Sequence, residues 1–386
     1  MLALQRSVGG YCVALTAVLG AACQADPDGA QVLVIERESG NIVFLNPFDG
    51  HVKDRIDTGA NLRHASMSFD PALRWAFVTT RTGELLRINL SRRVLDHRLS
   101  VGSNAIGQAI AADGSVVAVS GYEPGQIALV DPGTFQITAT FAARTREGKP
   151  SRVTGLVDAP GGRFVASLMD GDEAMILQKQ GESYRASSVA LAGSGPFDAL
   201  INRRGSHYLA GHQDGTISIL DLKTLKVQKI DPPTDDQTTP SKMMHLESWA
   251  DNGTTLFLPV PGQKKLWLLD SQSFAVLKTI SLPAHAIYVM NRPFSTETYV
   301  TLTGKDYDGT VLVLDQFSGE ELHRLEAGKK IYHLAFLPRG QRALIASNET
   351  NEVIHVDTTS RSIVNRTPVA SPAGMFGIWR AFEGGL

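Results

Sequence analysis

A regular recurrence is the feature that most constrains how this chain can fold. Apolar runs end at Asn, Asp or Gln followed by a turn, at successive spacings of 43, 42, 47, 43, 49, 45 and 42 residues. A period in this range, with four short strands in each unit, is typical of the blades of a β-propeller. The end points are Asn46, Asn89, Asp131, Gln178, Asp221, Asp270, Asp315 and Asp357. The sequence therefore predicts an all-β fold, an eight-bladed β-propeller within residues 30–386.

One repeat illustrates how each blade is built. Its strands are apolar stretches bounded by Gly, Pro and Asp, the usual signal of short strands separated by turns. We expect a loop over residues 121–125 between its second and third strands. The four predicted strands are Ala105–Ile110, Val116–Val119, Ile127–Val130 and Ile137–Phe141.

The two chain ends divide one blade between them. The first apolar run after Gln31, Val32–Ile35, has the pattern of a second strand, so the innermost strand of that blade must come from elsewhere. We expect it at the C-terminus, over Met375–Phe382. Pairing of the N- and C-terminal strands would close the ring and remove its open edges.

Successive loops of an antiparallel blade alternate between the two faces of the disc. We call "top" the face that carries the loops entering the innermost strands and the loops between second and third strands. The longest insertions, residues 144–152, 231–244 and 304–309, all open on this face. Binding residues concentrate on irregular loops held by a rigid scaffold, so the top face is the predicted functional face.

Residues 1–23 differ from the rest of the chain and predict an export signal. They contain one cation, Arg6, followed by an apolar run with small residues, which indicates export to the periplasm. The only cysteines, Cys12 and Cys23, lie here, and no Cys-x-x-Cys-His motif occurs, so we expect no covalently bound c-type haem. Cys23 is a candidate lipidation site, although Leu19 precedes it by four residues instead of the usual three. A lipid-anchored and a soluble periplasmic form both stay open.

Histidines and cations gather at the predicted top mouth of the channel. Four histidines precede or begin innermost strands: His64, His245, His285 and His333. Four cations accompany them: Arg63, Arg81, Arg152 and Lys242. Imidazole ligates metals or transfers protons near neutral pH, and guanidinium matches carboxylates. The pattern predicts a flat, anionic ligand, with or without a bound metal. The net charge of −2 argues against a nucleic-acid partner.

Five blocks resemble a known family: LRHASMSF (62–69), YEPG (122–125), RVTGLVDAP (152–160), GPFDAL (195–200) and KMMHLESW (242–249). They are similar to the NirF family of periplasmic proteins, which act in haem d1 biosynthesis. NirF resembles in turn the haem d1 domain of the cytochrome-type nitrite reductase, an eight-bladed propeller that carries its cofactor on the top face. The resemblance extends from about residue 32 to about residue 376.

The resemblance implies a role for each candidate residue. His64 would be the axial ligand of the iron in haem d1 or its precursor, and therefore the metal-binding residue. His245 would be the catalytic proton donor or acceptor. The other implied cofactor-binding residues are Arg81, Arg152, Lys242 and His285, of which the three cations would pair with the acid groups of the tetrapyrrole.

The nitrite reductase and the related dehydrogenase of the pathway carry an attached c-type haem domain, whereas we expect none in this chain, since it lacks the Cys-x-x-Cys-His motif. Any oxidation would therefore need a separate electron acceptor, such as a small c-type cytochrome. The implied partners are nitrite reductase and other haem d1 maturation proteins. Three functions stay open: an enzyme that modifies a late precursor, a carrier that delivers haem d1 without chemistry, and a propeller interaction module without a prosthetic group.

Overall fold

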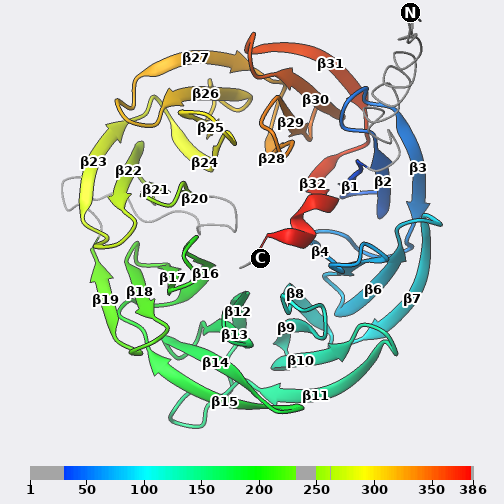
Figure 1. Ribbon diagram of the computed structural model, residues 1–386, viewed down its shortest axis with the longest axis vertical. Coiled ribbons are helices and arrows are strands. Elements are labelled where there is room, and N and C mark those ends of the chain that lie inside the picture. Colours follow the sequence, from blue (N-terminus) through cyan, green and yellow to red (C-terminus); the bar gives the residue numbers. More distant parts are fainter. Residues whose placement is uncertain (1–29, 232–248, 261, 384–386) are drawn as a thin grey trace, which may run out of the picture.

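The computed structural model describes residues 30–231, 249–260 and 262–383. They form eight four-stranded sheets arranged in a ring around a central channel (Figure 1). Every sheet is antiparallel, and its strands follow one another outward from the channel. The predicted all-β, eight-bladed propeller is therefore confirmed. Within the described residues, no helix is both long and apolar enough to cross a membrane.

The strands take the same four positions in every blade. The innermost strands are β32 (Pro372–Gly377), β4 (Ser66–Phe69), β8 (Asn104–Ile110), β12 (Val153–Ala159), β16 (Pro196–Ile201), β20 (Ala250–Asp251), β24 (His285–Asn291) and β28 (Ile331–Phe336). The second strands are β1 (Val32–Glu36), β5 (Trp75–Thr79), β9 (Val117–Glu123), β13 (Arg163–Leu168), β17 (His207–His212), β21 (Thr255–Pro259), β25 (Glu297–Thr303) and β29 (Arg342–Ser347).

The remaining strands lie nearer the rim. The third strands are β2 (Asn41–Leu45), β6 (Glu84–Asn89), β10 (Gly125–Asp131), β14 (Glu173–Gln180), β18 (Ile217–Asp221), β22 (Lys265–Asp270), β26 (Thr310–Asp315) and β30 (Glu352–Asp357). The outer strands are β3 (Val52–Asp57), β7 (Val94–Ser100), β11 (Gln136–Ala142), β15 (Ser183–Ala190), β19 (Val227–Ile230), β23 (Val276–Ser281), β27 (Glu321–Glu326) and β31 (Ser362–Pro368).

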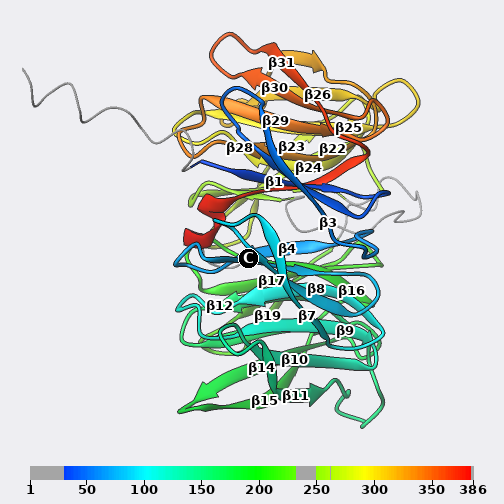
Figure 2. The ribbon, with the colours of Figure 1, turned by 90° about the vertical axis from the view of Figure 1, so that its right-hand side faces the viewer.

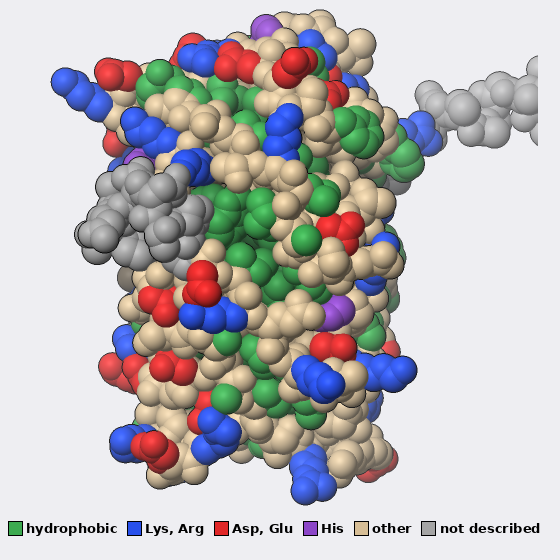
Figure 3. Space-filling view, turned by 90° about the vertical axis from the view of Figure 1, so that its left-hand side faces the viewer, with side chains coloured by type: hydrophobic (Ala, Val, Ile, Leu, Met, Phe, Trp, Pro, Cys, Tyr) green, Lys and Arg blue, Asp and Glu red, His purple; other side chains and the backbone are tan. Residues whose placement is uncertain are grey.

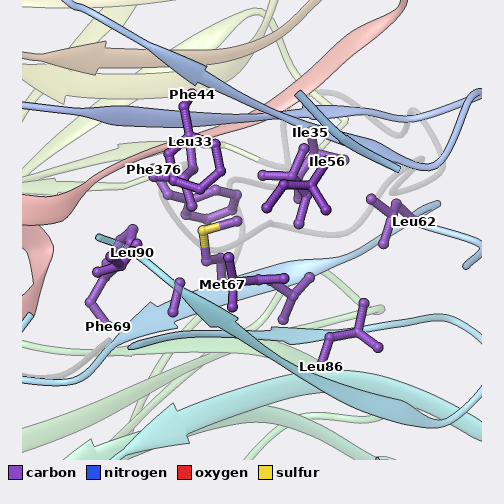
Figure 4. Packing of buried hydrophobic residues seen from close by; sticks show 14 residues of the cluster. Leu33, Ile35, Phe44, Ile56, Leu62, Met67, Phe69, Leu86, Leu90 and Phe376 are labelled. Atoms are coloured by element: carbon purple, nitrogen blue, oxygen red, sulfur yellow. The ribbon is translucent and has the colours of Figure 1, made fainter. Parts of the chain in front are cut away.

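The ring closes through its two ends, as predicted. β32 pairs with β1, and Phe376 lies opposite Leu33 in this pairing. Phe376 packs with Leu33, Phe44 and Met67 in a cluster shared by the first two blades (Figure 4). Burial of these side chains is the main stabilising term of the closure, because apolar surface leaves water on both sides of the seam.

The closing strand is shifted from its predicted bounds. It covers Pro372–Gly377, whereas residues Ile378–Phe382 form a 3-10 helix, η1. The shift has a simple cause: Gly377 pairs with Val32, the first residue of β1, so the closing strand has no further strand residue to pair with. η1 then turns toward the centre of the ring (Figure 1).

The two faces of the disc are distinguished by their connections. The bottom face carries the turns from first to second strands and from third to outer strands, together with η1. The backbone N–H of Ile378 donates to the carbonyl of Gln31 at 3.1 Å, so the chain enters β1 from the bottom face. In Figure 2, η1 marks this face on the left-hand side.

The innermost strands bend near their top ends. Register shifts occur there in the pairings β32–β1, β8–β9, β12–β13, β16–β17, β24–β25 and β28–β29. Such bulges redirect side chains and are frequent beside binding sites. The predicted loop over residues 121–125 is instead mostly strand, because β9 extends to Glu123 and β10 begins at Gly125. The longer hairpin carries Tyr122 up to the top mouth.

Candidate functional site

Two predicted cofactor-binding arginines meet at the top mouth, where both contact one tyrosine ring. The guanidinium carbon of Arg81 lies 5.5 Å from the ring centroid of Tyr122, and that of Arg152 lies 5.9 Å from it. Burial raises the pKa of the Tyr122 phenol, although both guanidinium groups oppose the rise. Arg81 lies in the β5–β6 loop and Arg152 in the loop that enters β12, so the two cations reach the Tyr122 ring from either side of its blade.

The hydrogen bonds of the two arginines differ. Arg152 is held by Asp170: its backbone N–H donates to Oδ2 at 2.8 Å, and Nη2 donates to Oδ1 at 2.5 Å. The Nη1 atom of Arg81 is buried without a hydrogen-bond partner among the described residues. Because a buried N–H donor without a partner costs free energy, Arg81 is suited to receive an anionic group of a ligand.

A glycine allows this arrangement. A side chain at Gly125 would overlap the carbonyl oxygen of Ser151, which directly precedes Arg152. The close backbone approach brings the loop of Arg152 against the hairpin of Tyr122. Gly125 belongs to the block YEPG, so the sequence contained the residue that joins the two elements.

A second cationic group surrounds Tyr332, the second residue of β28. Nη1 of Arg37 donates to the Tyr332 hydroxyl, and the guanidinium carbon lies 5.1 Å from the ring centroid. The ammonium of Lys330 lies 5.9 Å from the same centroid. Arg63 forms an ion pair with Glu38, which follows Arg37 in the loop between β1 and β2. Arg63 also holds the pKa of the Glu38 carboxyl below its ordinary value through their hydrogen bond.

His64 lies between the two cationic groups. It occupies a turn that is closed by the N–H of Ala65 donating to the carbonyl of Leu62 at 3.1 Å. The histidine has φ = 59°, in the left-handed region that bulky side chains rarely adopt, and its side chain is exposed. The N–H of Arg81 donates to the carbonyl of Asn61 at 3.2 Å, which ties this turn to the Arg81 loop. A histidine that is exposed on a turn at the mouth is placed to reach a ligand there.

Other polar groups line the upper channel. His285 begins β24 and is half-buried, as predicted for a residue at the mouth. Burial raises the pKa of the nearby Tyr288 phenol far above its ordinary value, and the charges of Tyr332 and Asp198 raise it further. Asp198, on the innermost strand β16, is therefore within electrostatic reach of Tyr288. It also raises the pKa of Tyr122.

His333 does not join the open mouth. It is buried, and its Nδ1 accepts the backbone N–H of Met375 at 3.1 Å. Its ring packs 5.8 Å from that of Tyr288 and 5.7 Å from that of Phe376. Burial lowers its pKa to about 4, so it is neutral at pH 7. The expectation that His333 contributes to the mouth is corrected: its apolar neighbours on β24 and β32 make it a packing residue.

Two predicted residues, Lys242 and His245, lie outside the described residues. The structure thus brings together His64, Arg81 and Arg152 and places His285 on the same face. Sequence reasoning assigned no role to Tyr122 or Asp198, although both lie in the blocks that carry the resemblance. It gave no signal for Tyr332.

A cavity of about 1400 Å³ occupies the lower channel, away from these residues. It is bounded by residues 111–113, 158–164, 200–205, 249–252 and 290–295, and by parts of η1. Two of its arginines are engaged: Arg163 donates to the carbonyl of Leu222 at 2.6 Å, and Arg292 pairs with Glu297 at 2.9 Å. We place the candidate site at the top mouth, where Arg81 still has a donor without a partner.

Comparison with known proteins gives the family. A model of the cytochrome D1 haem domain matches residues 28–381. The protein NirF of Stutzerimonas stutzeri is 33% identical over 378 residues, which cover 95% of this chain and 96% of that protein. NirF of Pseudomonas aeruginosa is 33% identical over 389 residues, covering 96% of this chain and 98% of the relative.

Solved structures share the fold. The dihydro-heme d1 dehydrogenase NirN in complex with DHE superposes with a TM-score of 0.82 at 21% identity, covering 93% of this chain and 77% of that one. AztD from Citrobacter koseri gives a TM-score of 0.64 at 13% identity, with 90% and 97% covered. The ring of eight sheets and the family match define an eight-bladed propeller of the cytochrome d1 haem-domain family. Within that class, the chain belongs to the NirF family.

Proposed function

We propose that this protein acts in haem d1 biosynthesis and binds haem d1 or a late iron-tetrapyrrole precursor, non-covalently, at its top mouth. The observation that carries the proposal is Arg81, whose buried Nη1 lacks a partner beside Tyr122, Arg152 and His64. Membership of the NirF family supports it. So does the 26% identity, over 326 residues, to the dihydro-heme d1 dehydrogenase of Pseudomonas aeruginosa.

The described residues fit such a ligand. Guanidinium groups bind carboxylates through paired hydrogen bonds, and Arg81 and Arg152 stand together where an acidic edge would lie. His64 is exposed on a turn at the same mouth, and a neutral imidazole is a suitable iron ligand. When bound, the iron tetrapyrrole supplies the redox chemistry, while the protein supplies the ligand, orientation and electrostatics.

Each site residue would have a distinct role in binding the tetrapyrrole or in acting on it. Arg81 and Arg152 would hold peripheral acid groups, together with the predicted Lys242. His64 would fix the metal, and His285 would line the pocket. His245 is proposed to hold or move a proton at the reacting substituent, which is the role of a general acid–base.

An enzyme and a carrier predict different results. We propose the enzyme, located in the periplasm, with a small c-type cytochrome as acceptor if the step is an oxidation, and with nitrite reductase as the destination of the product. The purified protein should convert a dihydro precursor when an electron acceptor is added, with the product identified by mass. A His245→Ala variant should bind the precursor but not convert it.

The carrier gives the opposite pattern. The wild type would leave the mass of the precursor unchanged with any acceptor, yet transfer haem d1 to apo nitrite reductase. The His245→Ala variant would transfer it equally well. Failure to bind any tetrapyrrole would refute both forms of the proposal.

A further inference from the structure

The exposed apolar side chains of this protein are distributed unequally between its two faces. Among the described residues, the large hydrophobics that are at least one-third exposed lie on bottom-face turns, on η1 or on outer strands, and none lies in a top-face loop. The aromatic members are Phe48, Phe294, Phe317 and Phe382, exposed by 48%, 91%, 74% and 71%. Exposed aromatic rings that are confined to one face favour that face as an interaction surface.

Rigid turns hold two of these rings away from the body. The N–H of Phe48 donates to Oδ1 of Asn46 at 2.9 Å, and the N–H of Phe317 donates to Oδ1 of Asp315 at the same distance. These are equivalent turns between third and outer strands. At the same position, other blades carry polar residues: Lys223, Gln272 and Thr359. The turn itself therefore has no need of an aromatic residue.

Phe294 is a third exposed aromatic residue that its turn does not require. It has φ = 54° in the turn between β24 and β25, a conformation that costs energy for a bulky residue. In the corresponding turns of other blades, the residue with positive φ is Leu73 in one blade and a glycine in four: Gly114, Gly205, Gly253 and Gly340. A phenylalanine that is strained and 91% exposed gains little from its own fold, so its value lies in contact with something else.

The path of the chain indicates what that partner is. Gln31 enters the disc from the bottom face, where its carbonyl accepts the N–H of Ile378. Eight residue steps separate Gln31 from Cys23, the predicted lipidation site, and they span at most about 28 Å. A lipid on Cys23 would therefore hold the bottom face, and not the top mouth, against the bilayer.

We propose that the bottom face docks on a phospholipid bilayer, with Phe48, Phe294, Phe317 and Phe382 in the interfacial region and the top mouth directed away from the membrane. Phenylalanine rings on a surface that lies in the interfacial plane bury into the boundary between headgroups and acyl chains. The exposed cations Arg203 and Arg339, also on bottom turns, would add attraction to anionic headgroups.

The rim is the competing surface. Hydrophobic side chains also gather there among scattered charges, on the side that faces left in Figure 1 (Figure 3). On the outer strand β23, Val276 and Leu277 are 48% and 60% exposed. A rim patch is suited to a protein neighbour in the plane of the disc, so the test must separate the two surfaces.

The first test is vesicle flotation with residues 24–386, which include every described strand and lack Cys23. Vesicles contain phosphatidylethanolamine and phosphatidylglycerol. We expect the wild type to float and the triple variant Phe48→Ser, Phe294→Ser, Phe317→Ser to bind at least tenfold more weakly. The rim variant Val364→Ser is the control and should match the wild type. Absence of wild-type binding, or equal binding by the triple variant, would overturn the proposal.

The second test reports orientation. Because residues 24–386 contain no cysteine, a single one can carry an environment-sensitive dye. Gln272→Cys places it on the bottom face and Lys305→Cys on the top; both positions are exposed. Vesicles should shift the emission of the dye to the blue only at residue 272. A shift only at residue 305 would refute the orientation. A dimer in light scattering that the triple variant abolishes, with no vesicle binding, would assign the face to a second copy instead.

Discussion

Replacement of Arg81 by Gln should separate ligand recognition from folding. In the free protein, Arg81 contributes mainly its contact with the Tyr122 ring, because its Nη1 has no partner among the described residues. A partly exposed cation–π contact contributes about 0.5–1 kcal/mol, so the folding stability of Arg81→Gln should fall by no more than that. With a carboxylated tetrapyrrole bound, the same guanidinium would gain a charge-assisted hydrogen bond of about 1.5–3 kcal/mol.

That difference translates into a measurable loss of affinity. Since about 1.4 kcal/mol corresponds to a factor of ten, the dissociation constant should rise about 10- to 100-fold in Arg81→Gln. The assay is a visible-absorption titration with the free-acid tetrapyrrole, repeated with its methyl ester. The loss should disappear with the ester, because the ester cannot form the ion pair.

The matched control is Arg324, whose guanidinium carbon lies 6.0 Å from the ring centroid of Tyr307 on another blade. Arg324→Gln removes an arginine–tyrosine contact that involves the outer strand β27, together with the ion pair of Arg324 to Glu321 at 2.8 Å, and should leave affinity unchanged. Equal losses in both variants, or an equal loss for acid and ester, would refute the assignment of Arg81 as a carboxylate-binding residue.

Three further predictions concern neighbouring residues. His64→Gly should keep or raise the melting temperature, because glycine relieves the positive φ; a loss of more than about 1 kcal/mol would show that His64 supports the fold. Because the pKa of His333 is lowered to about 4 from an ordinary 6.5, its contribution is complete above pH 6.5 and is lost as the pH falls toward 4, by roughly 3 kcal/mol. Urea unfolding of His333→Asn, which keeps an acceptor for Met375, should be less pH-dependent across that window, and an unchanged slope would contradict the burial argument. Gly125→Ala should weaken tetrapyrrole binding by displacing the Arg152 loop, whereas Gly133→Ala, on a bottom turn, should not; equal affinity of both variants would contradict the close-approach argument.

The repeat made most of the fold predictable from the sequence. Eight recurring turn residues fixed the number of blades, and the pattern of Val32–Ile35 implied closure by the C-terminus. The end of the closing strand could not be predicted, because it depends on where β1 begins and not on local composition. Residues 121–125 contain two glycines and a proline, which are turn signals, yet pairing with β8 and β10 extends the strand to Glu123.

The candidate site was predictable in part. Arg81 and Arg152 were expected on one face, and they do converge, but the ring of Tyr122 between them is a tertiary contact with no signature in spacing. For His333, the strand position alone led to a wrong prediction. It shares the strand position that suggested a mouth residue, but the bulge in β28 and packing from β32 bury it. The exposure of the phenylalanines on the bottom turns could not be predicted either, since a residue type alone does not reveal how exposed its side chain is.

The most direct test of the central claim is a visible-absorption titration of the purified apo-protein with haem d1 or its dihydro precursor, beside His64→Gly. Saturable binding is expected for the wild type, with a spectral change in the iron bands that His64→Gly lacks although it stays folded. Absence of saturable binding by the wild type would contradict a tetrapyrrole site at the top mouth. Identical spectra for both proteins would remove His64 as the iron ligand.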